Sequence, residues 1–288
     1  MEAINRVRSI CVMGRVVDFS VPAVMGIINY TPDSFYDGGK YRNPDAVAGH
    51  AVRLAEDGAD IIDVGAVSTR PGAPGISEKE ETGRLAEALE AIRKELPEVI
   101  LSVDTWRSGV AEIMIRDYGA GIINDISAGR LDDRMLDTAG KLKVPYIAMH
   151  MQGTPATMQE NPVYRDVVND IILYFSERVR IMRDAGIDDI IIDPGFGFGK
   201  SVDHNYEIAA RLKEFHVLEL PVLAGFSRKS MIYKVLGRGP GDALGGTIAL
   251  NTVAVMNGAH ILRVHDVREA RDTIEVAMRL KRVVEHGK

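Results

Sequence analysis

An acidic residue directly follows a run of apolar residues in the segment 190–201. The three isoleucines at 190–192 are typical of a strand buried on both faces, and Asp193 stands at its end. Gly199-Lys200-Ser201 resembles the end of a phosphate-binding loop motif, but that motif requires glycine at position 194, which is proline. The dinucleotide fingerprint fails too, because it requires glycine where Lys200 stands. We therefore expect a buried carboxylate at the carboxyl end of a parallel strand.

Polar side chains end the other apolar runs of the chain in the same way. Any one of them is more often a helix cap or a loop hydrogen bond than a ligand-binding group. Together they predict a binding site for a polar molecule, because the carboxyl ends of parallel strands meet at one face. These residues are Asn29, Asp63, Asp104, Asn124, Asp125, His150, Asp193, the group Ser227, Arg228, Lys229 and Ser230, and finally Arg263 and His265.

Eight strand–helix units in succession position these residues. Such a series without a linker or a change of composition favours a (β/α)8 TIM barrel, and we expect residues 1–288 to form one domain. A short β-hairpin, 10–13 with 16–19, is expected to close the bottom of the barrel. The expected strands are 24–29, 60–65, 99–104, 121–125, 144–150, 189–193, 221–225 and 260–264. The expected helices are 44–57, 78–95, 106–118, 132–140, 166–184, 203–213, 242–257 and 266–281, with Ser77 and Glu80 as a capping box before the second.

Composition excludes several classes of protein. The 288 residues carry a net charge of −6 without a basic block, which argues against binding to nucleic acid or to a membrane surface. The single cysteine, Cys11, excludes an internal disulfide framework and a cysteine zinc cluster. No segment is typical of a signal peptide or a membrane span. A cytoplasmic enzyme is expected.

Aspartates and asparagines at the barrel mouth are suited to a nitrogen heterocycle. A buried carboxylate can accept two hydrogen bonds at once from the ring and amino N–H groups of such a ligand. Asp193 is the first candidate because its strand is wholly apolar, although a salt bridge to a lysine is an alternative role. No strand ends in glutamate, which disfavours a glycosidase, and the histidines are too dispersed for a multi-histidine zinc site.

Basic residues follow the last two strands. Barrels of this kind often bind phosphate there, and Lys229, Arg263 and His265 are suitable donors to an anion. Arg263 and His265 lie two apart on one strand, so both side chains can point to the same side. Ion pairs with Asp266 or Glu269 are the alternative.

Two long loops, 29–35 and 68–72, follow the first two strands. Loops of this size in a compact barrel are usually functional lids. Beside a diphosphate, the carboxamide of Asn29 would complete a Mg²⁺ site, because Mg²⁺ takes a few protein oxygens together with substrate phosphate oxygens.

Eight short motifs occur in the order typical of one enzyme family. They make the chain resemble dihydropteroate synthase, the folate-pathway enzyme that sulfonamides inhibit, over nearly its whole length. The resemblance implies condensation of p-aminobenzoate with (7,8-dihydropterin-6-yl)methyl diphosphate, with Mg²⁺ as cofactor and a homodimer as assembly. The motifs are 25–35 (MGIINYTPDSF), 68–72 (STRPG), 102–105 (SVDT), 124–127 (NDIS), 149–155 (MHMQGTP), 193–200 (DPGFGFGK), 227–230 (SRKS) and 263–267 (RVHDV).

The resemblance also implies a role for each matching residue. It assigns Lys229 to the pterin and not to phosphate, and we follow it because Arg263 and His265 already serve the anion. The implied pterin ligands are Asp104, Asn124, Met149, Asp193 and Lys229. The implied diphosphate ligands are Asn29, Arg70, Arg263 and His265, with Asn29 also at the metal. The implied p-aminobenzoate pocket is Phe35, Thr69, Pro71, Phe198 and Ser230, and the implied catalytic residues are Asp104, Asp193, Lys229, Arg263 and His265.

Two positions depart from the family pattern. Gly65-Ala66-Val67 replaces the usual Gly-Gly-Glu, and Tyr30 replaces an aliphatic residue. The first departure keeps open a pterin-binding paralogue without activity. Two other functions also stay open at this point: a corrinoid methyltransferase acting on a methylated folate, and a Schiff-base aldolase that uses Lys229.

Overall fold

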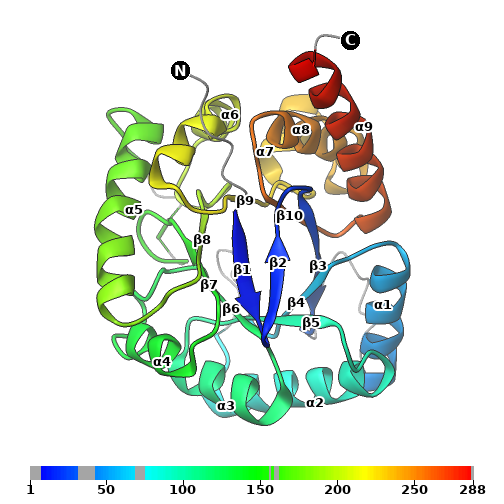
Figure 1. Cartoon of the computed structure of the whole chain (residues 1–288), viewed down its shortest axis with the longest axis vertical. Coiled ribbons are helices and arrows are strands. Elements are labelled where there is room, and N and C mark those ends of the chain that lie inside the picture. The colour runs from blue at the N-terminus through cyan, green and yellow to red at the C-terminus, as the bar shows by residue number, and fades with distance from the viewer. Residues whose placement is uncertain (1–7, 32–42, 69–74, 156, 159–161, 287–288) are drawn as a thin grey trace.

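Eight parallel strands form a closed barrel that helices surround, in a computed structural model that describes residues 8–31, 43–68, 75–155, 157–158 and 162–286 (Figure 1). The sheet has the order β8-β7-β6-β5-β4-β3-β10-β9, and a bridge between Ile192 and Val222 joins its two ends. The (β/α)8 prediction is confirmed. The strands are β3 (Ala23–Asn29), β4 (Ile61–Gly65), β5 (Ile100–Asp104), β6 (Ile122–Asp125), β7 (Tyr146–Met149), β8 (Ile190–Asp193), β9 (Leu223–Ala224) and β10 (Ile261–Val264).

The helices pack their apolar faces onto the outer face of this barrel, where they bury most of the hydrophobic core. They are α1 (Pro44–Glu56), α2 (Glu78–Glu95), α3 (Ser108–Tyr118), α4 (Met135–Leu142), α5 (Val167–Asp184), α6 (Val202–Ala210), α7 (Ser230–Leu236), α8 (Leu244–Met256) and α9 (Val267–His286), with short 3₁₀ helices at Leu212–Leu218 and Pro240–Asp242. None of the described helices is both long and apolar enough to cross a membrane.

A two-stranded antiparallel hairpin closes the amino end of the barrel, as the sequence predicted. β1 (Ser9–Val12) and β2 (Arg15–Asp18) lie in front of the barrel strands in Figure 1. Ile10 and Val12 pack with Met25, Ile61 and other residues from the first positions of the strands. This end is filled with apolar side chains, so ligands have the carboxyl end available to them.

Three local predictions need correction. Ser77 caps α2 by accepting from the Glu80 backbone N–H at 3.1 Å, but the Glu80 carboxylate pairs with Arg84, so only half of the capping box forms. The seventh strand has two residues where 221–225 was expected. The helix α7 was not expected, because its seven residues precede Gly237 in a glycine-rich stretch that is typical of a loop.

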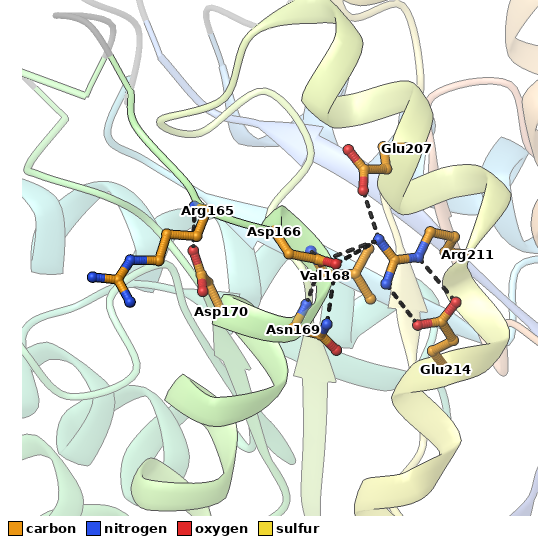
Figure 2. A network of polar contacts seen from close by, with 8 residues as sticks. All are labelled: Arg165, Asp166, Val168, Asn169, Asp170, Glu207, Arg211 and Glu214. Atoms are coloured by element: carbon orange, nitrogen blue, oxygen red, sulfur yellow. Dashed lines mark hydrogen bonds and ion pairs between the residues drawn. The ribbon is translucent and has the colours of Figure 1, made fainter.

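The expected helix 203–213 divides at Arg211, where a 3₁₀ helix begins. Figure 2 shows the guanidinium of Arg211 between Asp166, Glu207 and Glu214, with N–O distances of 2.6–3.1 Å. Asp166 also caps α5, since it accepts from the backbone N–H of Asn169 at 2.9 Å. One arginine thus joins the end of α6 to the start of α5.

Candidate active site

Side chains at the carboxyl ends of neighbouring strands share one mouth of the barrel. Asp104 of β5 is in register with Asn124 of β6, and Met149 of β7 is in register with Asp193 of β8. Asn124 and Asp193 are only 5% and 6% exposed. The structure therefore brings together these four side chains, which the resemblance implied for a heterocycle together with Lys229.

Arg263 of β10 crosses this mouth and pairs with two carboxylates. Its Nε donates to Asp63 Oδ2 at 2.7 Å, and its Nη2 donates to Asp104 Oδ2 at 2.8 Å. Asn124 Nδ2 donates to the same Asp63 oxygen at 3.0 Å. Arg263 was expected to serve only an anion, with Asp266 or Glu269 as alternative partners. Its partners here are instead Asp63 in the middle of β4 and Asp104 at the end of β5.

Asp63 is the site residue that sequence reasoning left without a role. It is fully buried, and its Oδ1 has no hydrogen-bond partner within the described part of the chain. The sequence placed it among the polar residues that end strands, but β4 continues to Gly65 and Asp63 lies in its middle. What the sequence could not indicate is that Asp63 faces Arg263, 200 residues away.

Burial sets the protonation of Asp104. Desolvation raises the pKa of its carboxyl from 3.8 to about 7, against the lowering effect of the Arg263 guanidinium, while the nearby Asp63 charge raises it further. Asp104 therefore changes its charge near neutral pH.

Asp193 and Lys229 form a second pair of opposite charges. Burial raises the pKa of the Asp193 carboxyl, and the Lys229 ammonium and the Gly195 N–H, which donates at 2.7 Å, oppose that shift. Burial also lowers the pKa of Lys229 to about 8. Lys229 donates to the carbonyl of Phe196 at 2.6 Å, and its ammonium lies 5.0 Å from the centre of the Phe198 ring.

An apolar wall lies beside these charges. Met149 packs with Ile126, Met151 and Met158 in a small buried cluster, and the half-buried rings of Trp106 and Phe198 lie against it. Met149 and Phe198 were expected at the site from the resemblance. Ile126 and Met151 were missed, although both lie within the motifs at strand ends. The wall can hold the flat face of an aromatic ligand.

His265 lies beside Ser227. The Ser227 Oγ is 2.9 Å from His265 Nδ1 and accepts from the His265 backbone N–H at 3.1 Å. Burial and the Arg263 charge lower the pKa of His265 to about 3, so the ring is neutral at neutral pH. A hydroxyl that donates to Nδ1 places the ring proton on Nε2, where it can serve an anion. Arg228 pairs in bidentate fashion with Asp266.

Comparison with known proteins identifies the family. The family model described as pterin binding enzyme matches residues 25–265. Dihydropteroate synthase of Escherichia coli (strain K12) is 46% identical over 265 residues, which cover 91% of this chain and 93% of that protein. The chain belongs to the dihydropteroate synthase family of pterin-binding enzymes.

Solved structures of this dihydropteroate synthase family share the fold. That of Yersinia pestis, with a sulfonamide drug complex, has a TM-score of 0.90 at 41% identity and covers 96% of this chain and 99% of its own. That of Xanthomonas albilineans with 4-aminobenzoic acid has a TM-score of 0.87 at 40% identity, with 96% and 98% covered. The same synthase in complex with 7,8-dihydropteroate has a TM-score of 0.84 at 37% identity, with 95% and 98% covered.

The remaining residues that the dihydropteroate synthase resemblance implied fall into two groups. Asn29 is half-buried at the carboxyl end of β3, beside Gly65 of β4, and Ser230 is the first residue of α7. Arg70 and the other loop residues of the expected arylamine pocket lie outside the described residues; those others are Phe35, Thr69 and Pro71.

Two strand-end residues serve the scaffold of this dihydropteroate synthase family member. Asp125 accepts from the Tyr146 hydroxyl at 2.5 Å and from the backbone N–H groups of Ser127 and Gly129, both at 2.7 Å. His150 is buried beside Lys200. A residue at a strand end therefore belongs to the site only when the pleat directs it into the barrel.

Proposed function

We propose that this chain condenses p-aminobenzoate with (7,8-dihydropterin-6-yl)methyl diphosphate to form 7,8-dihydropteroate and diphosphate. The observation that carries the proposal is the group of Asp104, Asn124 and Asp193 around Arg263 at the mouth of the barrel. The names of the related proteins support it, since a related synthase was solved both with 4-aminobenzoic acid and with 7,8-dihydropteroate.

The pterin would lie between the strand-end aspartates and the methionine wall. Asp193 would accept hydrogen bonds from the pterin amino group and ring N–H, and Asp104 and Asn124 would bind the opposite edge. Lys229 would donate to a pterin acceptor, and Met149 would pack on the ring. Carboxylates in a desolvated site bind a developing positive charge more strongly than water does.

The diphosphate would bind at the basic side of the mouth. Arg263 and the Nε2 of His265 are the proposed donors in the described residues, and Arg70 is a third from the loop outside them. Binding of an anion would raise the pKa of His265, because a negative charge favours the imidazolium. Ser227 orients the ring for this role.

We propose Asn29 as the protein ligand of a Mg²⁺ ion that the diphosphate brings with it. The described residues contain no group of three or more His, Cys, Asp or Glu side chains that could hold a metal on their own. A half-buried carboxamide fits a metal that takes most of its ligands from phosphate oxygens and water. When bound, Mg²⁺ would neutralise charge on the leaving diphosphate.

The arylamine would enter beside Phe198 and Ser230. The proposed pocket takes Phe35, Thr69 and Pro71 from the two long loops, and the cluster around Met149 forms its inner wall. The hydrophobic wall would exclude water from the reacting carbon, and the pocket would hold the amine in line with it.

The proposed reaction is an ionisation followed by capture. The bond between the pterin methylene carbon and the diphosphate oxygen breaks, and its electron pair leaves with the diphosphate. The dihydropterin delocalises the resulting cation, which Asp193 and Asp104 stabilise electrostatically. The amine nitrogen then forms the new bond to the carbon and releases one proton, so a strong general base is not required.

A coupled assay of diphosphate release tests the function. The pterin diphosphate is supplied with and without p-aminobenzoate, in Mg²⁺ and in excess chelator. We expect product and fast diphosphate release only with both p-aminobenzoate and Mg²⁺. Tight pterin diphosphate binding without product would instead identify a pterin-binding protein without this activity.

The pH dependence of pterin binding should follow Asp104. The raised pKa means that ionising Asp104 costs folding stability, so the contribution of this carboxyl to stability is fully present below about pH 4 and is lost as pH rises through about 7. The ionised carboxylate is the form that accepts pterin N–H bonds, so kcat/KM for the pterin diphosphate should rise over the same range. The asparagine of Asp104→Asn does not titrate, so this rise of kcat/KM with pH should be absent. Other pH-dependent changes of kcat/KM should remain. A rise of kcat/KM through pH 7 that survives the substitution would contradict the assignment.

We also propose a homodimer through the outer face of α8 and α9, which pack against each other (Figure 1). Exposed apolar side chains gather on these two helices, at Val253, Met256, Val276, Leu280 and Val284. The family resemblance implies a dimer, and a second copy would bury this face.

Light scattering should give twice the chain mass, and Val276→Glu with Leu280→Glu should give a monomer. Val163→Glu, which alters an exposed valine elsewhere, is the control. A monomeric unaltered chain would refute this interface.

A cytoplasmic location is likewise proposed. A single cysteine that forms no disulfide suits a reducing compartment. Cell fractionation followed by the synthase assay would test it, and activity confined to an extracytoplasmic fraction would refute it.

A further inference from the structure

The β8 loop, residues 194–200, carries one buried lysine that the proposed mechanism does not use. Lys200 is 4% exposed, and burial lowers the pKa of its ammonium to about 7. A buried lysine is costly unless its donors are satisfied. Hydrogen-bond acceptors are therefore expected around the Lys200 ammonium.

The three donors of the Lys200 ammonium meet three acceptors. Nζ donates to the Phe198 carbonyl at 2.9 Å and to the His150 carbonyl at 3.3 Å, and it lies 3.0 Å from His150 Nδ1. Burial and the Lys200 charge lower the pKa of His150 to about 2, so the imidazole is neutral and its Nδ1 can accept. Lys200 thus joins the β8 loop to the end of β7.

Two glycines let the β8 loop lie directly on the chain after β7. Gly195 has φ of 74°, and a Cβ there would lie 1.9 Å from the His150 carbonyl oxygen. Gly199 has φ of 63°, and its Cβ would lie 2.7 Å from the Gln152 carbonyl oxygen. Because the contacting atoms are backbone atoms, they cannot move aside for a side chain at either glycine. The loop therefore packs against this segment in a fixed position, which the hydrogen bonds of Lys200 stabilise.

Other bonds hold the β8 loop on both sides of Phe198. Lys229 donates to the Phe196 carbonyl at 2.6 Å, and the Tyr164 hydroxyl donates to the Gly199 carbonyl at 2.7 Å. Among the described residues, the methionine cluster and the Lys229 ammonium hold the Phe198 ring itself. The Phe198 backbone, from which the ring projects, is held at its N–H, which donates to the Gly195 carbonyl at 3.1 Å, and at its carbonyl, which Lys200 holds.

We propose that Lys200 is a positioning residue that fixes the Phe198 ring for the arylamine through the Phe198 and His150 carbonyls. This rests on the proposed function, which places Phe198 in the p-aminobenzoate pocket. Lys200 touches neither substrate. Its removal should affect the arylamine more than the pterin, because Lys200 Nζ bonds the Phe198 and His150 carbonyls and no pterin ligand, and reaches Asp193 only through its charge.

Lys200→Met tests this, because methionine fills a similar volume without donors. We expect the KM for p-aminobenzoate to rise ~10-fold or more, the scale of a lost charge-assisted hydrogen bond, with the KM for the pterin diphosphate within ~2-fold. Amide exchange of the β8 loop without ligands should become ~10-fold faster. The control is Lys213→Met, which alters an exposed lysine in the following 3₁₀ helix. Values equal to that control, or equal rises of both KM values with a lower melting temperature, would overturn the proposal.

Two further variants keep the test decisive. If Lys200→Met does not fold, Tyr164→Phe removes another bond of the same loop without altering a buried charge, and the KM for p-aminobenzoate should rise ~3-fold. No change in that KM would overturn the proposal. Phe198→Ala tests the pocket assignment separately: an unchanged KM for p-aminobenzoate would refute the proposed arylamine pocket, whereas faster loop exchange in Lys200→Met would still support the anchoring by Lys200.

Discussion

Asp193→Asn should lower turnover by at least ~10²-fold while the chain keeps its fold, because this is the size of losing one preorganised electrostatic group. Asparagine has the shape of aspartate, and its carbonyl oxygen can still accept from the Gly195 N–H, which now bonds Asp193 at 2.7 Å. What is lost is the negative charge near the developing pterin cation. Steady-state kinetics with both substrates, together with thermal unfolding, measure the two effects separately.

Asp189→Asn is the matched control, since Asp189 precedes the same strand at the opposite end of the barrel. Its carboxylate accepts from the Cys11 backbone N–H of the hairpin at 3.0 Å. It should leave turnover unchanged. Near-normal turnover in Asp193→Asn would remove Asp193 from the mechanism.

Arg263→Met should lower both stability and activity. The substitution leaves the fully buried Asp63 carboxylate without its cation, which typically costs about 3 kcal/mol or more in the free energy of unfolding. It also frees Asp104 from its partner and removes a proposed diphosphate ligand, so turnover should fall ~10²-fold or more. Denaturant unfolding and the diphosphate-release assay measure the two losses.

A second substitution separates the two effects of Arg263→Met. Adding Asp63→Asn removes the stranded charge, so the double variant should regain much of the lost stability but none of the activity. Arg84→Met, which breaks a half-exposed pair with Glu80 on α2, should cost less than about 1 kcal/mol. A single variant as stable as the original chain would show that Asp63 and Arg263 are not coupled as the structure indicates.

Much of the candidate site could be inferred from the sequence because parallel strands end at the same face. Asp104, Asn124 and Asp193 each follow an apolar run, and that pattern alone indicated a common mouth. The same pattern did not show which of the residues at strand ends point into the mouth. Asp125 also ends a strand, yet it points away from the mouth and holds the following turn through Ser127. Alternation along a strand shows which residues share a face, but assigning that face to the inside of the barrel requires the exact residue at which the strand begins.

Lys200 illustrates a second limit. Its sequence context, after alternating glycines and phenylalanines, first resembled a phosphate-binding loop. The structure shows instead that those glycines allow close contact with β7, and that Lys200 turns inward to two carbonyls and an imidazole. Such contacts join segments that are 50 residues apart, and no local pattern records them.

The sequence by itself determined the barrel, the hairpin that closes it, the family and the mouth where the chemistry is expected. These follow from local periodicity and from motif order, which depend on neighbouring residues. Only the tertiary structure decided that Arg263 pairs with Asp63 and Asp104, and that the β8 loop is held on β7. The reason is physical: ion pairs and pKa values inside a barrel depend on distance and burial across strands, and closure of the barrel sets both.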